Sequence, residues 1–251
     1  MKNDYAHYLL DFIVIVLGIS VSYFLNDQKT EHEKSEKEQV ILSSLLSDIE
    51  VMEAYIHSRQ QTLKSDSLWM DYLVTHWDRV NQDSMVNEFT KTRFHASFHN
   101  LFLDIREFHL PIASFQMVIQ DGSLNLISNT EVKRLINTVV FLSKEQLLNN
   151  VQQEMDLQLA FQDRLMQDGD PELISMLSVT HEELEDRFAG SLDYTDQSRD
   201  EIRVILSKPY AKNYLSLKFR HRYFVNIFLR RFAAEVRDLK GLIRAEIDGR
   251  G

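Results

Sequence analysis

Three histidines and two carboxylates lie close together near the middle of the chain. His95, His99, Asp104, Glu107 and His109 fall within fifteen residues. On a helix, His95 and His99 would share a face and could bind zinc, with a carboxylate as third ligand. However, the sequence HASFH lacks the glutamate that follows the first histidine of a metalloprotease helix. We therefore predict no metal ligands, although binding by His95, His99 and His109 stays an open alternative.

A second candidate for chemistry is a stretch near the C-terminus in which basic and aromatic residues alternate. Residues 218–232 read KFRHRYFVNIFLRRF. Such a segment could contact anionic lipid headgroups or nucleic-acid phosphates. The candidate residues for anionic-lipid contact are Lys218, Arg220, Arg222, Arg230 and Arg231. In the alternative interpretation, the phenylalanines face a protein core and the arginines pair with acidic helices of the same chain.

The charge distribution supports internal pairing. The net charge is −10, and the segment from Arg199 to the C-terminus carries 13 Lys and Arg against 6 Asp and Glu. This balance of +7 leaves −17 for the first 198 residues. An acidic chain with a basic final segment argues against a general nucleic-acid partner.

No pattern typical of catalysis is present. The chain has no cysteine, which excludes a cysteine nucleophile, thiolate metal sites and disulfides. Glycines are scattered singly apart from the terminal GRG, so there is no phosphate-binding loop and no nucleophile elbow. We predict that the protein is not an enzyme and binds no cofactor.

The elements that position these residues are predicted to be helices. Only 7 Gly and 3 Pro occur among 251 residues. Sheets need many turns, and turns usually need Gly, Pro or Asn-Gly pairs. The composition therefore predicts an all-α fold.

The N-terminal segment is predicted to be a membrane anchor. Phe12 to Leu25 carries no charge, and extension back to Tyr8 gives 18 residues interrupted only by Asp11. As a helix this run spans roughly 27 Å, enough for a thin bilayer core. Its Leu, Ile, Val and Phe residues contribute about −3 to −6 kcal/mol of insertion free energy, against roughly +3 kcal/mol for a central Asp. A cleaved signal peptide and a buried helix of a soluble core are the two alternatives.

One face of this segment carries small and polar residues. Asp11, Gly18, Ser22 and Asn26 recur at helical spacing, and Gly18 and Ser22 form a small-xxx-small pair. These four residues are our candidates for association between membrane helices. Alternatively, they are ordinary residues of a membrane helix. The lysines on either side of the run do not decide its orientation.

The anchor is expected to continue into a long helix and an antiparallel bundle. Ile41, Leu45, Ile49, Met52 and Ile56 recur at steps of three and four, typical of an amphipathic helix. Further helices are predicted over residues 112–119, 129–166, 171–177, 201–207 and 210–247, with loops over 168–171 and 190–198 and no clear prediction for 81–110. The predicted divisions are residues 1–26 (anchor), 27–80 (stalk and first long helix) and 81–251 (rest of the bundle).

Two segments resemble a known group of proteins. The run from Asp11 through Ile19 to Asn26, followed by a charged helix, and the sequence QDGSLNLISNTEVKRLI from Gln120 to Ile136 are similar to a family of uncharacterised, N-terminally anchored bacterial membrane proteins. This family usually has a second Asn and a Trp after the first Asn, where this chain has Asp27 and Gln28. The resemblance implies a single-pass anchor in a bacterial cell membrane and a helical body, and it implies no activity.

The sequence therefore favours a membrane-anchored helical scaffold or regulatory protein that acts through protein–protein contacts. Its partners would be the lipid bilayer and either further copies of itself or another protein. The alternative is a sensory ectodomain that binds a small ligand and signals through a partner.

Overall fold

The computed structural model describes residues 2–79, 82–91, 98–103, 108–168, 171 and 196–249. Among these residues every regular element is helical, so the all-α prediction is confirmed. The elements are α1 (Lys2–His76), α2 (Gln82–Lys91), η1 (His99–Leu103), α3 (Ala113–Gln120), η2 (Ser123–Leu126), α4 (Thr130–Phe141), η3 (Leu142–Leu148), α5 (Asn149–Asp168), α8 (Asp196–Leu206) and α9 (Pro209–Asp248).

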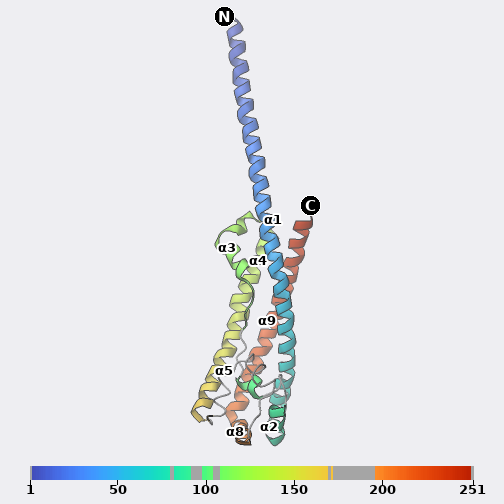
Figure 1. The fold of residues 1–251 in the computed structure, drawn as a ribbon, viewed down its shortest axis with the longest axis vertical. Coiled ribbons are helices and arrows are strands. Elements are labelled where there is room, and N and C mark those ends of the chain that lie inside the picture. The colour runs from blue at the N-terminus through green and yellow to red at the C-terminus, as the bar shows by residue number, and fades with distance from the viewer. Residues whose placement is uncertain are drawn as a thin grey trace.

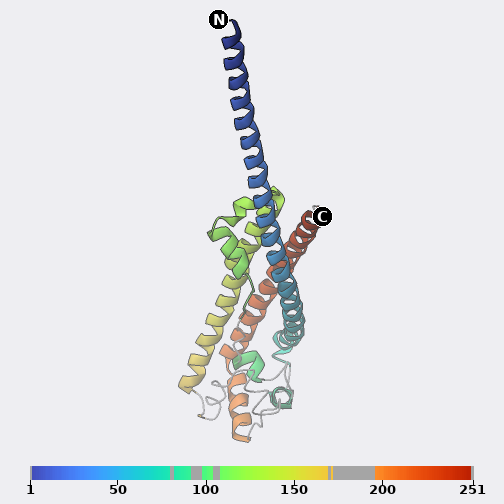
Figure 2. The same ribbon diagram turned by 45° about the horizontal axis from the view of Figure 1, so that its top comes forward.

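Three long rods build the molecule (Figures 1 and 2). The first is α1, which runs for 75 residues, and the second is the continuous helix formed by α4, η3 and α5. The third rod, α9, runs for 40 residues in the opposite direction and packs against both others. The predicted long first helix is confirmed, and α9 is antiparallel as expected.

Local sequence signals account for several helix ends. The side chain of Asn129 accepts hydrogen bonds from the N–H groups of Glu131 and Val132, which makes Asn129 the N-cap of α4. Gly122 follows α3 with a φ of 80°. A side chain there would be strained, so glycine suits this end of the helix. Pro209 begins α9, where its missing N–H costs no hydrogen bond.

The second rod contains a π-helical section, η3, between α4 and α5. Leu142 and Leu147 are both buried although they are five residues apart. A π turn holds one more residue than an α turn, so it returns the apolar stripe to the core after a step of five. This step was already visible in the sequence as an irregularity of the stripe.

Two apolar clusters hold the rods together. The proximal core lies nearer the N-terminal extension, and the distal core lies at the opposite end of the bundle. The long helices supply to the proximal core Leu42, Leu45, Ile49, Met52, Ile56, Val132, Leu135, Ile136, Val139, Leu142, Leu147, Val151, Val225, Leu229, Phe232, Val236, Leu239 and Ile243. The distal core includes Met70, Leu73, Met85, Val86, Phe98, Leu101, Phe102, Leu103, Phe161, Leu165, Ile202, Ile205, Leu206, Ala211, Tyr214 and Leu215.

The short helices complete the distal end. Helices α2 and α8 pack against each other there, joined by an ion pair of 2.7 Å between Arg203 and Asp83. The prediction of a loop up to residue 198 is wrong at its end, because α8 begins at Asp196. The predicted helix over 171–177 lies outside the described residues except for residue 171, as do residues 190–195 of the predicted loop.

The N-terminal part of α1 extends well beyond the bundle (Figure 1). Every described side chain from Val14 to Glu33 is exposed. The bundle begins at Glu38, which is 1% exposed and accepts hydrogen bonds from the N–H of Ser128 (2.6 Å) and its hydroxyl (2.9 Å). In the part of the chain with described side chains, which starts at Val14, no helix has both the length and the apolar character to cross a membrane.

Candidate functional site

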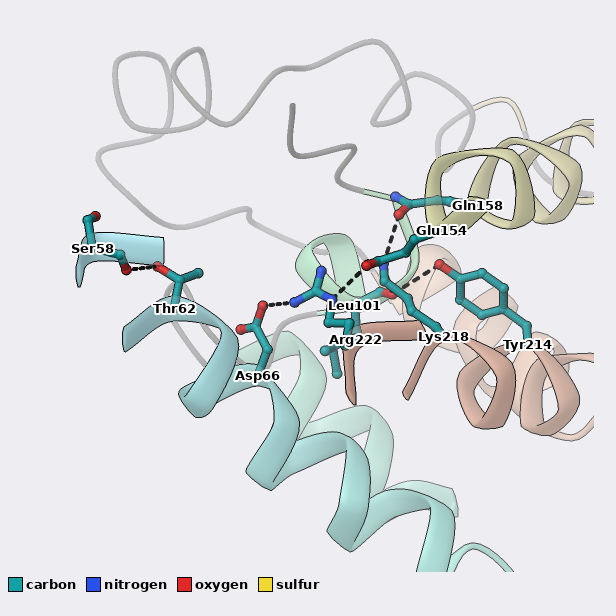
Figure 3. Close-up of polar contacts among 9 residues, drawn as sticks. All are labelled: Ser58, Thr62, Asp66, Leu101, Glu154, Gln158, Tyr214, Lys218 and Arg222. Carbon is teal, nitrogen blue, oxygen red and sulfur yellow. Dashed lines mark hydrogen bonds and ion pairs between the residues drawn. The ribbon is translucent and has the colours of Figure 1, made fainter. Parts of the chain in front are cut away.

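A layer of buried charges separates the two apolar cores (Figure 3). Its centre is Arg222 of α9, whose side chain is 4% exposed. The guanidinium pairs through one terminal nitrogen with Asp66 of α1 and through Nε with Glu154 of α5 at 2.7 Å. The carboxylates are 1% and 13% exposed. One arginine therefore joins all three rods inside the bundle.

Lys218 extends this layer by one turn of α9. Its ammonium is fully buried and donates hydrogen bonds to the carbonyl of Leu101 and to Oε1 of Gln158, both at 2.8 Å. The hydroxyl of Tyr214 donates to the same carbonyl at 3.3 Å. The Tyr214 ring stacks on Phe161, with 4.1 Å between ring centroids. The polar layer thus merges directly into the aromatic packing of the distal core.

Burial and neighbouring charges shift two pKa values in this layer. Burial on its own would lower the pKa of Arg222, but the charges of Glu154 and Asp66 and their hydrogen bonds outweigh it, so the pKa is raised. Burial is also the main reason that the pKa of Tyr214 lies well above its usual value, with a smaller contribution from the Glu154 charge. Arg222 is therefore permanently charged, and Tyr214 is a neutral hydrogen-bond donor at physiological pH.

The charged layer was not predicted, although the sequence carries a signal for it. Lys218 and Arg222 lie between Leu215 and Val225 at the same steps of three and four that place apolar residues in the core. Asp66 similarly precedes buried Met70 by four residues. A charged residue at a core position predicts a buried ion pair, since an isolated buried charge is too costly.

A small cavity lies beside the layer. It has a volume of about 30 Å³ and is lined by Arg59, Thr62, Leu63, Phe108, Val151, Glu154, Arg222 and Val225. This volume suits a water molecule and is far below that of a pocket for a metabolite.

The five basic residues proposed for lipid contact separate into two groups. Lys218 and Arg222 lie inside the bundle, so the prediction of lipid contact is wrong for these two. Arg220, Arg230 and Arg231 are exposed on α9. The Arg220 guanidinium lies 5.9 Å from the centre of the Phe224 ring. Helical spacing separates the two groups, because Lys218 and Arg222 continue the stripe of Leu215 and Val225, whereas the other three lie off it.

Pairing between the basic final helix and the acidic helices is confirmed for four of its cations. Besides Arg222, Lys240 pairs with Glu53 at 2.5 Å and Arg244 with Glu50 at 3.0 Å, both on α1. Lys212 pairs with Asp78 at 2.7 Å. Phe232 is buried as the alternative interpretation required, but Phe224 is 37% exposed.

The candidate residues for helix association lie on the extension of α1. Gly18, Ser22 and Asn26 are exposed, and a Cβ added to Gly18 would meet no described atom within 4 Å. The Asn26 carbonyl accepts a hydrogen bond from the Thr30 hydroxyl at 2.8 Å. Asp11 belongs to α1, but its side chain lies outside the described part of the structure. Association through this stripe stays a prediction.

The histidine cluster lies mostly outside the described residues. His95, Asp104 and Glu107 are not described, and neither is the side chain of His99. His109 is exposed, and its backbone N–H donates to the Tyr55 hydroxyl at 2.9 Å. Among the described side chains, no group of three or more His, Asp or Glu residues could hold a metal ion.

Comparisons of this chain with protein-family models, with curated proteins and with solved structures give no match. The resemblance to a family of anchored bacterial proteins therefore stays a prediction.

Proposed function

We propose that this protein is a single-pass, membrane-anchored helical scaffold that holds a bundle at a set distance from the bilayer and acts through protein–protein contacts. The observation that carries the proposal is the exposed apolar run at the start of α1. Within it, Val14, Leu17, Ile19, Phe24 and Leu25 are 58% to 66% exposed, and no other described element covers them.

An apolar run of this kind is unfavourable in water. Apart from the narrow stripe of Gly18 and Ser22, apolar side chains cover the circumference of the helix between Phe12 and Leu25, so no rotation of the helix could hide them all against the bundle. Transfer into lipid removes this surface from water, and all backbone hydrogen bonds stay inside the helix. With the preceding residues back to Tyr8, the run is about 27 Å long as a helix, close to the thickness of a thin bilayer core.

The part of α1 between the apolar run and Glu38 determines how far the bundle lies from the bilayer. Glu38, the first buried residue of α1, lies thirteen positions after Leu25. At a rise of 1.5 Å per residue, the bundle begins about 20 Å beyond the apolar run. Pairs at i and i+4, such as Lys29 with Glu33 at 3.8 Å, support the helix there without any tertiary packing.

This spacing supports protein rather than lipid as the partner of the exposed cations. Arg222 is level with Asp66, which lies 41 residues beyond Leu25 on the same helix. The neighbouring Arg220 would thus be about 60 Å from the bilayer that α1 enters.

The anchor is tested by placing charges in the apolar run of the full-length chain. We expect the unmodified chain to sediment with membranes and to resist extraction by alkaline carbonate. The double variant Val16→Arg/Ile19→Arg should move to the soluble fraction, because each central arginine costs about 2.5 to 3.5 kcal/mol of insertion free energy.

A matched control uses valines of the same helix outside the run. Val40 and Val51 are 71% and 58% exposed, so Val40→Arg/Val51→Arg adds the same charge and should leave the chain in the membrane. Extraction of the unmodified chain by carbonate, or unchanged membrane retention of the Val16→Arg/Ile19→Arg variant, would refute the proposal.

A further inference from the structure

Two exposed faces of the bundle carry opposite charges. The basic face consists of Leu217, Arg220, Phe224, Ile227 and Arg231, at steps of three and four along α9. The acidic face consists of Gln152, Asp156, Leu159, Asp163 and Met166, at the same kind of steps along α5, with Glu145 exposed two turns earlier. Each face therefore combines charges of one sign with apolar side chains.

The apolar members of both faces are well exposed. Leu217 and Leu159 are each 44% exposed, and Phe224 and Met166 are 37% and 49% exposed. Exposed apolar residues surrounded by charges of one sign are typical of contact surfaces.

The charges of the two faces are not matched within one copy. No acidic residue occurs in α9 from Pro209 to Ala234. Among the described residues, Arg220 and Arg231 form no ion pair, and neither do Asp156 and Asp163. The nearest described partner of Arg220 is the Phe224 ring, and that of Asp156 is the amide of Gln152 at 2.8 Å.

The contacts between α5 and α9 show which residues of the two helices lie at the same height along the bundle axis. Arg222 pairs with Glu154 and Lys218 with Gln158, and the two helices run in opposite directions. By this register Arg220 is level with Asp156, and Leu217 is level with Leu159. The register continues toward the proximal end, where Asn129 contacts Glu246 at 2.5 Å, so Arg231 is level with Glu145.

We propose that the basic face of α9 docks on the acidic face of α5 in a second copy of the chain that stands beside it. This inference rests on the proposed membrane anchor, which would hold all copies parallel and at the same height. Residues that are level within one copy are then also level between copies. Arg220 therefore meets Asp156 of the next copy, Leu217 meets Leu159, and Arg231 meets Glu145.

The contact joins two different surfaces rather than two identical ones. If the basic face met its own counterpart in a symmetric dimer, arginines would oppose arginines, and like charges across an interface are repelled. When two copies are joined in this way, one still has a free basic face and the other a free acidic face. Further copies can therefore add and form a ring or a row. This arrangement suits a scaffold.

The absence of cysteine makes the register directly testable by disulfide crosslinking. Two differently tagged full-length chains, one with Leu217→Cys and one with Leu159→Cys, are expressed together, and their membranes are oxidised. We expect a disulfide-linked product that carries both tags and exceeds either single-tag product at least fivefold.

Leu68 provides the matched control. It is 66% exposed on α1, close to the height of Arg220 because Asp66 pairs with Arg222. A chain with Leu68→Cys should give at least fivefold less product with the Leu217→Cys chain. Equal yields from Leu68→Cys and Leu159→Cys, or crosslinking of Leu217→Cys only to another protein, would overturn the inference.

Charge reversal tests the proposed ion pair between Arg220 of one copy and Asp156 of the next, and it distinguishes loss of this pair from misfolding. Arg220→Glu in the Leu217→Cys chain should reduce the mixed product severalfold, and Asp156→Arg in the Leu159→Cys chain should do the same. When both reversals are present in the same mixture, the product should return. A misfolded variant would not be rescued by a change in another copy, so lack of rescue overturns the proposed pairing.

Carbonate extraction of the same membranes separates this inference from the proposed anchor. If the chains stay in the membrane but Leu217→Cys does not crosslink to Leu159→Cys, the docking surface is wrong and the anchor stands. If the chains are soluble and the mixed product still forms, the anchor is wrong and the contact between copies stands.

Discussion

The proximal core and the charged layer are adjacent sections of the same three rods, and they are stabilised in different ways. In the proximal core, Leu45, Ile49 and Phe232 are fully buried among other apolar side chains. In the layer, the buried residues are Asp66, Lys218 and Arg222. Burial of apolar surface is non-directional and tolerates sliding between helices, whereas an ion pair with fixed geometry does not. We therefore expect the core to supply stability and the layer to set the register of the rods.

The largest effect is expected from removing the central arginine. Arg222→Leu would leave the carboxylates of Asp66 and Glu154 buried without their cation. Loss of one partner of a buried pair typically costs about 3 to 5 kcal/mol. We expect this loss in the free energy of unfolding, measured with urea in detergent micelles by the fluorescence of Trp69 and Trp77. Arg220→Leu, on the exposed side of α9, is the control and should change stability by less than about 0.5 kcal/mol.

A smaller change in the free energy of unfolding, in the stabilising direction, is expected when Asp66, Glu154 and Arg222, the ion-pair triad, are all replaced by apolar residues. The variant Asp66→Leu/Glu154→Leu/Arg222→Met removes all three charges together, so no member of this triad is left without its partner. Such replacements are often neutral or stabilising by about 1 to 4 kcal/mol. If the layer sets the register, this variant should also lose the selective disulfide between Leu217→Cys and Leu159→Cys. A triple variant that is strongly destabilised would mean that the charges themselves supply stability.

The smallest effect is expected within the proximal core. Ile49 is fully buried, and Ile49→Val removes one methylene from a close-packed site. This change typically costs about 0.5 to 1.5 kcal/mol. The same urea titration should show this loss. The disulfide between Leu217→Cys and Leu159→Cys should still form selectively, because the proximal core does not set the register of the rods. Loss of this selectivity would remove the distinction between core and layer.

Much of the helical structure could be predicted because it depends on residues close together in the sequence. The scarcity of Gly and Pro and the stripe from Leu45 to Ile56 are properties of the sequence itself, and the structure confirms the helices and the buried face that they predict. The predicted helix over 201–207 is wrong at its start, because α8 begins at Asp196. Its first turn begins with Asp196, which favours a helix N-terminus, but the surrounding polar residues carry no apolar stripe.

The charged layer depends on contacts that the sequence could not supply. Arg222 and Arg220 belong to one basic segment, and the spacing that places Arg222 on the core stripe does not identify its partner. Its partner Asp66 lies 156 residues away, and nothing local to either residue indicates that they meet. Only the packing of α9 between α1 and α5 decides which carboxylates meet Arg222.

The sequence alone therefore determined that the chain is helical, that its first helix is long and that the apolar run of this helix precedes its amphipathic stripe. These properties follow from backbone preferences and from hydrophobic spacing over a few turns. The tertiary structure decided which helix faces meet, which carboxylates pair with the buried cations and which cations remain for a partner. These choices arise from contacts between distant segments, whose free energy depends on all three rods at once.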